Sequence, residues 1–247
     1  MKGLKTVAVI GMVVLMVTVG SAEEKDKKLS NEAEFSFEDT SGNTEVTTLS
    51  AQNMLTYIFN KKIQSTWGLG ALYGESNGEE NAEKYYTEVK GEYSVTPKLF
   101  TSITAGWKQD KPSGTDHQYY VGPSLGYKFL TGAKHLFTSE AGVDYVSETY
   151  IDGSDDEYTR GRLLAKYEFI ISKKTKMTQT TEYLHDFEND EKFTINSETA
   201  FTSELNGNLS LKTSYTVNYD NEPASDDDHM ALDKTDTDVK ITLVVHY

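Results

Sequence analysis

The segment DVKITLVVHY, residues 238–247, alternates between apolar and polar side chains and stops on an aromatic residue. A period of two is typical of a β-strand whose two faces meet different surroundings. One face of this strand carries Val239, Ile241, Leu243, Val245 and Tyr247. The other face carries Asp238, Lys240, Thr242, Val244 and His246. We expect this strand to close a β-barrel, with its apolar face toward lipid.

The same alternation recurs along the chain, in segments separated by turn-forming residues. No stretch shows a convincing helical period. The segments cover residues 33–39, 45–59, 62–74, 84–95, 99–109, 117–129, 135–149, 158–171, 176–187, 192–204, 209–219 and 238–247. They predict an all-β fold, a transmembrane antiparallel up-and-down β-barrel of about twelve strands formed by residues 33–247.

Segment length and aromatic placement favour a membrane barrel over a soluble sandwich, whose strands usually have about 5 or 6 residues. Ten residues at about 3.3 Å each, tilted by about 40°, cover roughly the 25 Å of an outer-membrane apolar band. Tyrosine and phenylalanine gather near the segment ends, while Leu125, Val143 and Leu163 lie between them. Two aromatic belts around an aliphatic middle suit the two interfaces of a bilayer.

The connections alternate between two kinds. Short turns lie at residues 60–62, 96–98, 130–134, 172–175 and 206–208, and longer acidic loops lie at 75–83, 110–116, 151–157 and 221–236. Outer-membrane barrels keep short turns in the periplasm and longer loops outside. We therefore expect a bacterial outer-membrane protein that contacts membrane lipid and lipopolysaccharide.

The first residues, MKGLKTVAVIGMVVLMVTVGSA, predict a signal peptide at residues 1–22, because two lysines precede an apolar run and small residues. Residues 23–32 are expected to form a periplasmic linker. The chain has no cysteine, which excludes disulfides and a lipid anchor on cysteine. Loss of Lys2 and Lys5 with the signal peptide lowers the formal charge by two, from −15 to −17. Such acidity argues against nucleic acid as a partner, because phosphates need basic residues.

Alternation places many charged side chains in the lumen, where water or opposite charges can compensate them. They could line a narrow pore and bias its ion selectivity, or they could pair across the axis and plug it. Twelve strands fall between small filled barrels and wide porins of 16 or more. The residues predicted to line the lumen are Lys84, Glu88, Lys90, Glu92, Lys108, Lys128, Glu140, Asp144, Arg160, Arg162, Lys166, Glu168, Glu182, Glu198 and Lys240.

The sequence gives little support for a metal site or an enzyme. Its five histidines have no ligand spacing, and we expect no cofactor and no structural metal. A Ser-His-acid hydrolase would need a serine beside a histidine at lipid level, and only His135 and His185 are candidates by position. Divalent cations could bridge the acidic loops to lipopolysaccharide phosphates, although a solvated loop is the simpler interpretation. The carboxylates concerned are Asp152, Asp155, Asp156, Glu157, Asp226, Asp227 and Asp228.

Three stretches resemble the salt-induced outer-membrane proteins, a bacterial family of unknown function. They are SGNTEVTTLSAQ (41–52), GPSLGYKF (122–129) and TDTDVKITLVVHY (235–247). The resemblance implies an outer-membrane β-barrel whose expression responds to salt, and it brings no catalytic residues. The terminal Tyr247 and the apolar face of its strand also resemble the signal that the barrel-insertion machinery recognises.

We therefore expect a non-enzymatic outer-membrane barrel with a structural or narrow-channel role in the response of the envelope to ionic conditions. An outer-membrane hydrolase of the lipase type is one alternative. A soluble periplasmic β-barrel that binds a ligand is the other, because a soluble barrel can show the same alternation.

Overall fold

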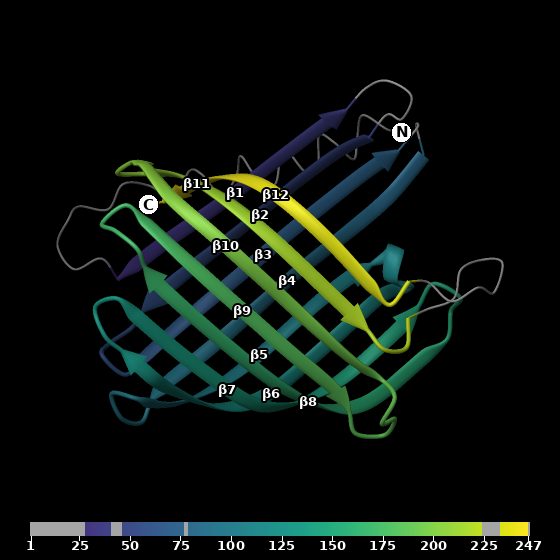
Figure 1. Ribbon diagram of the computed structural model, residues 1–247. Coiled ribbons are helices and arrows are strands. Elements are labelled where there is room, and N and C mark those ends of the chain that lie inside the picture. The colour runs from purple at the N-terminus through teal and green to yellow at the C-terminus, as the bar shows by residue number, and fades with distance from the viewer. Residues whose placement is uncertain (1–27, 41–45, 77–78, 224–232, 247) are drawn as a thin grey trace.

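The computed structural model describes residues 28–40, 46–76, 79–223 and 233–246. These residues form a closed barrel of twelve antiparallel strands, in which each strand pairs with its neighbours in the chain. The first strand, β1 (Leu29–Thr40), closes the barrel on the last, β12 (Thr235–His246) (Figure 1). The prediction of an up-and-down β-barrel with about twelve strands is confirmed. The expected signal peptide and Tyr247 lie outside the described residues.

The remaining strands follow in chain order. They are β2 (Val46–Ile58), β3 (Ile63–Ser76), β4 (Glu79–Ser94), β5 (Leu99–Asp110), β6 (Thr115–Thr131), β7 (His135–Tyr150), β8 (Asp155–Ile170), β9 (Thr175–Asp186), β10 (Phe193–Asn206) and β11 (Leu209–Asp220). Each corresponds to one expected segment. A single turn of 3-10 helix, η1 (Lys111–Ser113), joins β5 to β6.

Several strands are longer than the alternation predicts. β1 begins at Leu29, so residues 29–32 of the expected linker belong to the barrel, where Leu29 pairs with Tyr57. β4 begins five residues before residue 84, and β8 begins three residues before residue 158. The hairpin of β7 and β8 continues because its polar groups bond to each other, with Thr149 Oγ1 donating to Asp155 Oδ1 at 2.7 Å. The loop predicted at 151–157 is therefore shorter.

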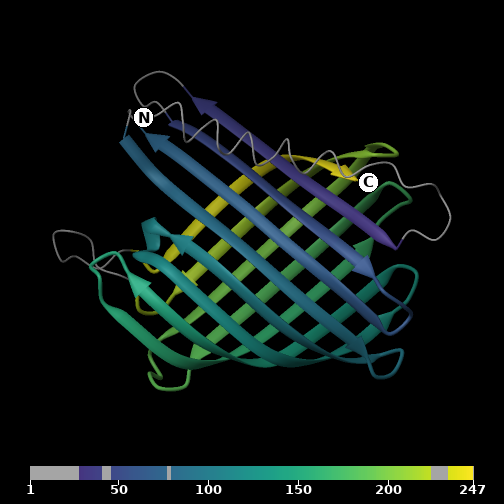
Figure 2. The ribbon, with the colours of Figure 1, turned by 180° about the vertical axis from the view of Figure 1, so that it is seen from behind.

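Exposed and buried side chains alternate along the strands, as a period of two requires. In β6, Tyr119, Val121 and Leu125 are exposed, whereas Gln118 and Ser124 are buried. Strands of the near and far walls cross at an angle when the barrel is seen from the front and from behind (Figures 1 and 2), as tilted barrel strands do. The outer surface is therefore mainly apolar and the inner surface mainly polar.

The short turns are shaped by side chains that bond to the backbone two residues later. Asn60 Oδ1 accepts from the N–H of Lys62 at 2.8 Å, and Thr96 Oγ1 accepts from the N–H of Lys98 at 3.2 Å. Ser172 accepts in the same way from Lys174 at 3.2 Å. Asn, Ser and Thr favour turns for this reason. Local sequence thus fixes these hairpins without help from the rest of the barrel.

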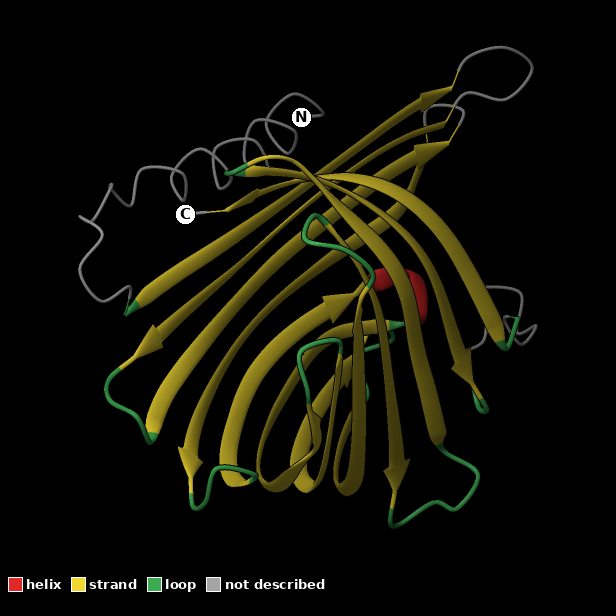
Figure 3. Ribbon diagram, turned by 60° about the vertical axis from the view of Figure 1, so that its left-hand side comes forward, coloured by secondary structure: helices red, strands yellow, loops and turns green. Residues whose placement is uncertain are grey.

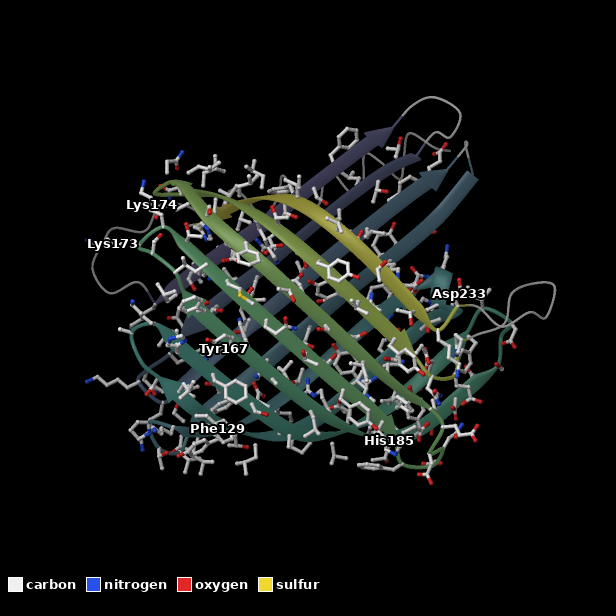
Figure 4. All side chains as sticks on the ribbon, viewed as in Figure 1. Phe129, Tyr167, Lys173, Lys174, His185 and Asp233 are labelled. Atoms are coloured by element: carbon white, nitrogen blue, oxygen red, sulfur yellow. The ribbon has the colours of Figure 1, made fainter. Side chains whose placement is uncertain are left out.

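The two ends of the barrel differ in chemistry. We call the end with the turns after β2, β4, β6, β8 and β10 the short-turn end, and the opposite one the long-loop end (Figure 3). Lys173 and Lys174 lie at the short-turn end, while His185 and Asp233 lie at the other (Figure 4). No helix among the described residues is long and apolar enough to cross a membrane.

Candidate functional site in the lumen

Glu140 is the centre of a buried polar cluster inside the wall formed by β4 to β8. Its carboxylate forms an ion pair with Lys90 of β4, which reaches past β5 and β6 to β7. Ser102 Oγ and Ser124 Oγ both donate to Oε2 of Glu140, at 3.3 and 3.1 Å. Only side chains on the inner face can make contacts that skip two strands. The carboxylate is thus held by three partners from three other strands.

Asp144 lies four residues after Glu140 on β7, two positions further along the same inner face, and it is the centre of a second cluster. It is fully buried, and its Oδ2 lies 3.4 Å from Nε of Arg160 and 3.6 Å from Nε of Arg162. Arg160 also donates to Gln118 Oε1 at 3.2 Å, and Arg162 donates to Thr104 Oγ1 at 3.3 Å. Two guanidinium groups around one carboxylate leave a local excess of positive charge.

Two tyrosines extend this network toward the long-loop end. Tyr120 donates to Glu88 Oε2 at 2.7 Å, and Tyr158 donates to Glu148 Oε2 at 2.9 Å. The guanidinium of Arg160 lies over the Tyr120 ring, 5.1 Å from its centroid. Together with the Glu140 and Asp144 clusters, these groups line the inner wall of β4 to β8.

The opposite wall carries a smaller cluster and several small buried residues. Lys212 of β11 lies 3.2 Å from Glu34 of β1 and 3.1 Å from Glu198 of β10. Small buried residues on the inner faces of this wall include Ser50, Ala200, Ser214 and Thr242.

The other predicted lumen residues have local partners or none. Lys84 pairs with Asp110 at 3.0 Å, Glu168 with Lys176 at 3.3 Å, and Lys240 with Asp238 at 3.0 Å. Lys128 lies over the Phe100 ring, 5.5 Å from its centroid, and Glu92 accepts a hydrogen bond from Gln64. Within the described part of the chain, the side chains of Lys108, Lys166 and Glu182 form no ion pair and no hydrogen bond, although their backbones are paired in the barrel.

A cavity of about 730 Å³ lies inside the long-loop end. Its lining includes the cations Lys84, Lys108, Arg160 and Lys192, and carboxylates near the rim such as Asp220, Glu222, Asp233 and Asp236. Lys192 lies outside the strands. Burial lowers the pKa of its ammonium group, but the hydrogen bonds that this group donates to Tyr150 and Asp156 have the larger combined effect, so the pKa is raised. The cavity therefore presents cations below an acidic rim.

The two histidines considered for hydrolysis do not form a triad. His135 Nδ1 is 2.7 Å from the Tyr167 hydroxyl and its ring stacks on Phe169. His185 stacks beside Tyr183 and lies 3.8 Å from the Asp190 carboxylate. Among the described residues, neither has a serine hydroxyl as a hydrogen-bond partner. Both rings lie against neighbouring aromatic side chains.

A serine, a histidine and a carboxylate meet instead near the short-turn end, on the inner side of β11, β12 and β1. Ser210 Oγ lies 3.1 Å from Nε2 of His246, and Nδ1 of His246 lies 3.4 Å from Oε2 of Glu32. The sequence analysis did not single out this set. Alternation places His246 on the inner face, but it gives no sign of which serine lies on the next strand.

No group of three or more potential metal ligands occurs within residues 28–40, 46–76, 79–223 and 233–246. Asp226, Asp227 and Asp228 lie outside these ranges. Asp155 and Asp156 are part of β8, so they are held in a hairpin rather than in a loop.

Comparison with solved structures shows the same fold in an outer-membrane channel. The COG4313 outer membrane channel from Pseudomonas putida F1 matches with a TM-score of 0.56 and 10% identity, over 92% of this chain and all of that one. The NanC porin matches with a TM-score of 0.49 and 10% identity, over 88% and 97% of the two chains. At 10% identity the likeness to the COG4313 channel shows a shared barrel fold alone.

Comparisons of sequence give the family. The chain is 27% identical over 183 residues to the uncharacterized protein YdiY of Escherichia coli (strain K12), which covers 74% of this chain and 71% of that protein. A family model described as "Protein of unknown function, DUF481" matches residues 33–247, the whole expected barrel. The resemblance to a family of unknown function is thus confirmed, and this chain belongs to the family of DUF481 proteins.

Proposed function

We propose that the protein is an outer-membrane barrel that acts as a narrow channel for small hydrophilic solutes and ions. The observation that carries the proposal is the cavity inside the long-loop end, with Lys108 on its wall. The Lys108 side chain makes no direct ion pair with any residue that the structure describes, although the carboxylates of Asp110, Glu148 and Glu182 are near enough to act on its charge. A buried charge without a direct partner costs free energy in a dry site, so this lysine is tolerable when water and mobile anions reach it.

The arrangement of the two walls supports a narrow channel. The clusters around Glu140 and Asp144 pair charges on one wall of the lumen, while residues of both walls, such as Arg160 and Asn218, line the cavity at the long-loop end. The sequence left two possibilities for the lumen charges, which either pair with one another or line a pore. We propose that both occur, in different parts of one lumen. Charges that remain unpaired near a constriction bias the selectivity of ion flow.

Single-channel recording of the refolded mature chain in planar bilayers tests this proposal. We expect discrete conductance steps, and Lys108→Glu should shift the reversal potential in a salt gradient toward cation selectivity. Lys173→Glu, at an exposed turn of the short-turn end, is the matched control and should shift it less. A folded barrel without conductance steps would overturn the channel, and equal shifts would remove Lys108 from its path.

A role in the response to salt is the second part of the proposal, and it rests on the family resemblance. If it holds, the amount of the protein in the envelope should rise with external salt, and deletion of its gene should slow growth at high salt. Quantitative immunoblots of outer-membrane fractions from cells grown at several salt concentrations measure the first effect. An unchanged amount would exclude regulation by salt.

Assembly and lipid contacts are proposed from the outer faces of the strands. Val239, Ile241 and Leu243 are exposed on β12 and would be presented to lipid and to the barrel-insertion machinery. Val245 is partly covered, and Tyr247 lies outside the described residues. Changing Leu243 to Asp should reduce the amount of barrel recovered from outer membranes.

Divalent cations that bridge the acidic loops to lipopolysaccharide also stay a proposal, which calcium titration of the folded barrel would test.

A hydrolase is the second candidate function, and the Ser210, His246 and Glu32 arrangement favours it. In a triad the histidine accepts the serine proton while the carboxylate orients the ring. Ser210 is only 4% exposed, so an ester would have to reach it from the lumen. A fluorophosphonate probe should label wild-type barrel and fail to label Ser210→Ala, while Ser214→Ala, a neighbouring inner serine, should still be labelled. Absence of labelling in the wild type would exclude this function.

A further inference from the structure

The seam between the first and last strands is paired over a third of its length. β1 and β12 share four residue pairs, from Glu32 with His246 to Phe35 with Leu243. By contrast, β1 pairs with β2 along all its twelve residues. No pairing joins residues 36–40 to residues 235–242, and both ranges are described. The two strands diverge toward the long-loop end (Figures 1 and 3). We call these two unpaired edges the open seam.

The outer side of the open seam is apolar. Phe37 on β1 is 67% exposed, and Val239 and Ile241 on β12 are 65% and 66% exposed. These are the three highest exposures of large apolar side chains in the part of the chain that the structure describes. These side chains are so exposed because β1 and β12 are not paired here, and neither strand covers the side chains of the other. Apolar surface of this kind gains most from contact with hydrocarbon.

The inner side of the open seam is polar. Ser36 Oγ bonds to Ser50 Oγ of β2 at 3.0 Å, and Lys240 pairs with Asp238 on its own strand at 3.0 Å. These polar side chains thus contact partners on their own side of the seam, and neither contact crosses it. The cavity of the long-loop end reaches the same place, because Asp236 of β12 is part of its lining.

The open seam requires an occupant of mixed polarity. Unpaired backbone N–H and C=O groups are costly in hydrocarbon, so bare lipid chains cannot cover these edges alone. An added β-strand could pair with them, but inward-pointing charges such as Asp238 and Lys240 are a common protection of an edge against strand addition. An amphiphile fits both sides, with an acyl chain against Phe37 and Ile241 and a polar head among the inner groups.

We propose that the open seam is a lateral passage through which a single-chain amphiphile, such as a fatty acid, moves between the lumen and the surrounding membrane. This deepens the channel proposal by naming a substrate class for the same lumen. It can be tested separately, because contact between an acyl chain and the lumen is measurable whether or not the barrel conducts ions.

The test measures quenching of tryptophan by doxyl-stearic acid in vesicles that contain the folded barrel. In a background with Trp67→Phe and Trp107→Phe, Lys240→Trp places the reporter on the inner face beside the open seam. Thr180→Trp on β9, which is paired on both sides, is the matched inner control, and Leu125→Trp is the outer control. We expect strong quenching at positions 240 and 125 and weak quenching at 180. If Lys240→Trp does not fold, Thr216→Trp on β11, paired with Asp238, replaces it.

A disulfide across the seam then decides the route. Oxidised Phe37→Cys with Ile241→Cys should lower quenching of the reporter to the level at position 180, and reduction should restore it. Quenching at 240 no stronger than at 180 would overturn the proposal. Quenching unchanged by the disulfide would also overturn it, since the chain would then enter from an end of the barrel. If the single variant Ile241→Cys formed disulfide-linked dimers and no quenching were seen at position 240, the occupant of the seam would be a second copy of the chain.

Discussion

Oδ2 of Asp144 lies 3.4 Å from both Nε and Nη2 of Arg160, inside a barrel wall where Asp144 has no exposed surface. The two residues belong to β7 and β8, whose hydrogen-bonded pairing places them directly opposite each other. Arg162 approaches the same oxygen from the next inner position of β8. One carboxylate thus lies against two guanidinium groups, and the register of the sheet brings them together.

Removal of Asp144 should therefore destabilise the barrel strongly. Asp144→Ala leaves Arg160 and Arg162 without their carboxylate, and breaking a buried pair from one side costs roughly 3 to 5 kcal/mol. Equilibrium unfolding in urea with lipid vesicles, followed by gel mobility, measures the loss. Asp238→Ala is the control, since the Asp238 carboxylate is half exposed beside Lys240 and its loss should cost far less. Equal losses of stability in Asp144→Ala and Asp238→Ala would contradict the view that burial makes the Asp144 ion pair important.

Gly122 should not tolerate a side chain. A Cβ at this position of β6 would overlap the carbonyl oxygen of Val143 and Oδ1 of Asp144, and neither the backbone nor the buried carboxylate can move far. Gly122→Ala is expected to lower the yield of folded barrel and its stability. Gly207→Ala lies in a turn with nothing within 4 Å of the added Cβ, and it should fold like the wild type. Normal folding of both variants would show that β6 and β7 can separate at this point.

Charge on the lipid face should be far more costly than charge in the lumen. Leu125→Arg puts an arginine on the exposed face of β6, at an expected cost of about 2 to 4 kcal/mol near the bilayer centre. Alternation alone predicts that Ser124→Arg is mild, but the surroundings of Ser124 lead us to expect a large cost. Ser124 is 6% exposed and bonds to Ser102 and Glu140, so an arginine has no room there. The suitable lumen variant for comparison is Thr180→Arg, because position 180 is partly exposed on the inner face and Glu182 beside it has no ion pair with another described residue. Urea unfolding should show a much smaller loss of stability for Thr180→Arg than for Leu125→Arg.

The strands were predictable because each carries its own signal. The period of two, the turn residues such as Asn60 and Thr96, and the aromatic ends are local features of the sequence. Alternation also assigns Asp144 and Arg160 to one face. Their ion pair depends on the register between strands, which differs by one residue wherever the ladder shifts, as between Lys128 and Leu130.

The outer face shows a second limit of sequence reasoning. Polar residues occur among the outward positions of β9 and β10, where an aliphatic middle was expected. Gln179 donates to Ser197 Oγ at 2.9 Å and accepts from Thr199, so these groups satisfy one another across two paired strands. Periodicity records which face a residue occupies, but not whether its polar atoms find partners on that face. The Ser210 and His246 contact was missed for the same reason.

The turn before β8 offers a test of electrostatics outside the membrane-spanning strands. The Ser154 hydroxyl and backbone N–H both donate to Asp152 Oδ1, at 2.6 and 2.9 Å, and they hold the pKa of Asp152 below its ordinary value of 3.8. A lowered pKa means that the carboxylate stabilises the turn above pH 3.8, and that this stabilisation is lost as the pH falls through the lower folded-state value. Carbon-detected NMR titration of Asp152 measures its midpoint. Ser154→Ala should raise the midpoint toward the ordinary value, because the hydroxyl has the larger effect, while Ser154→Thr should keep it low. A midpoint that Ser154→Ala leaves unchanged would show that the hydroxyl does not bond to this carboxylate in solution.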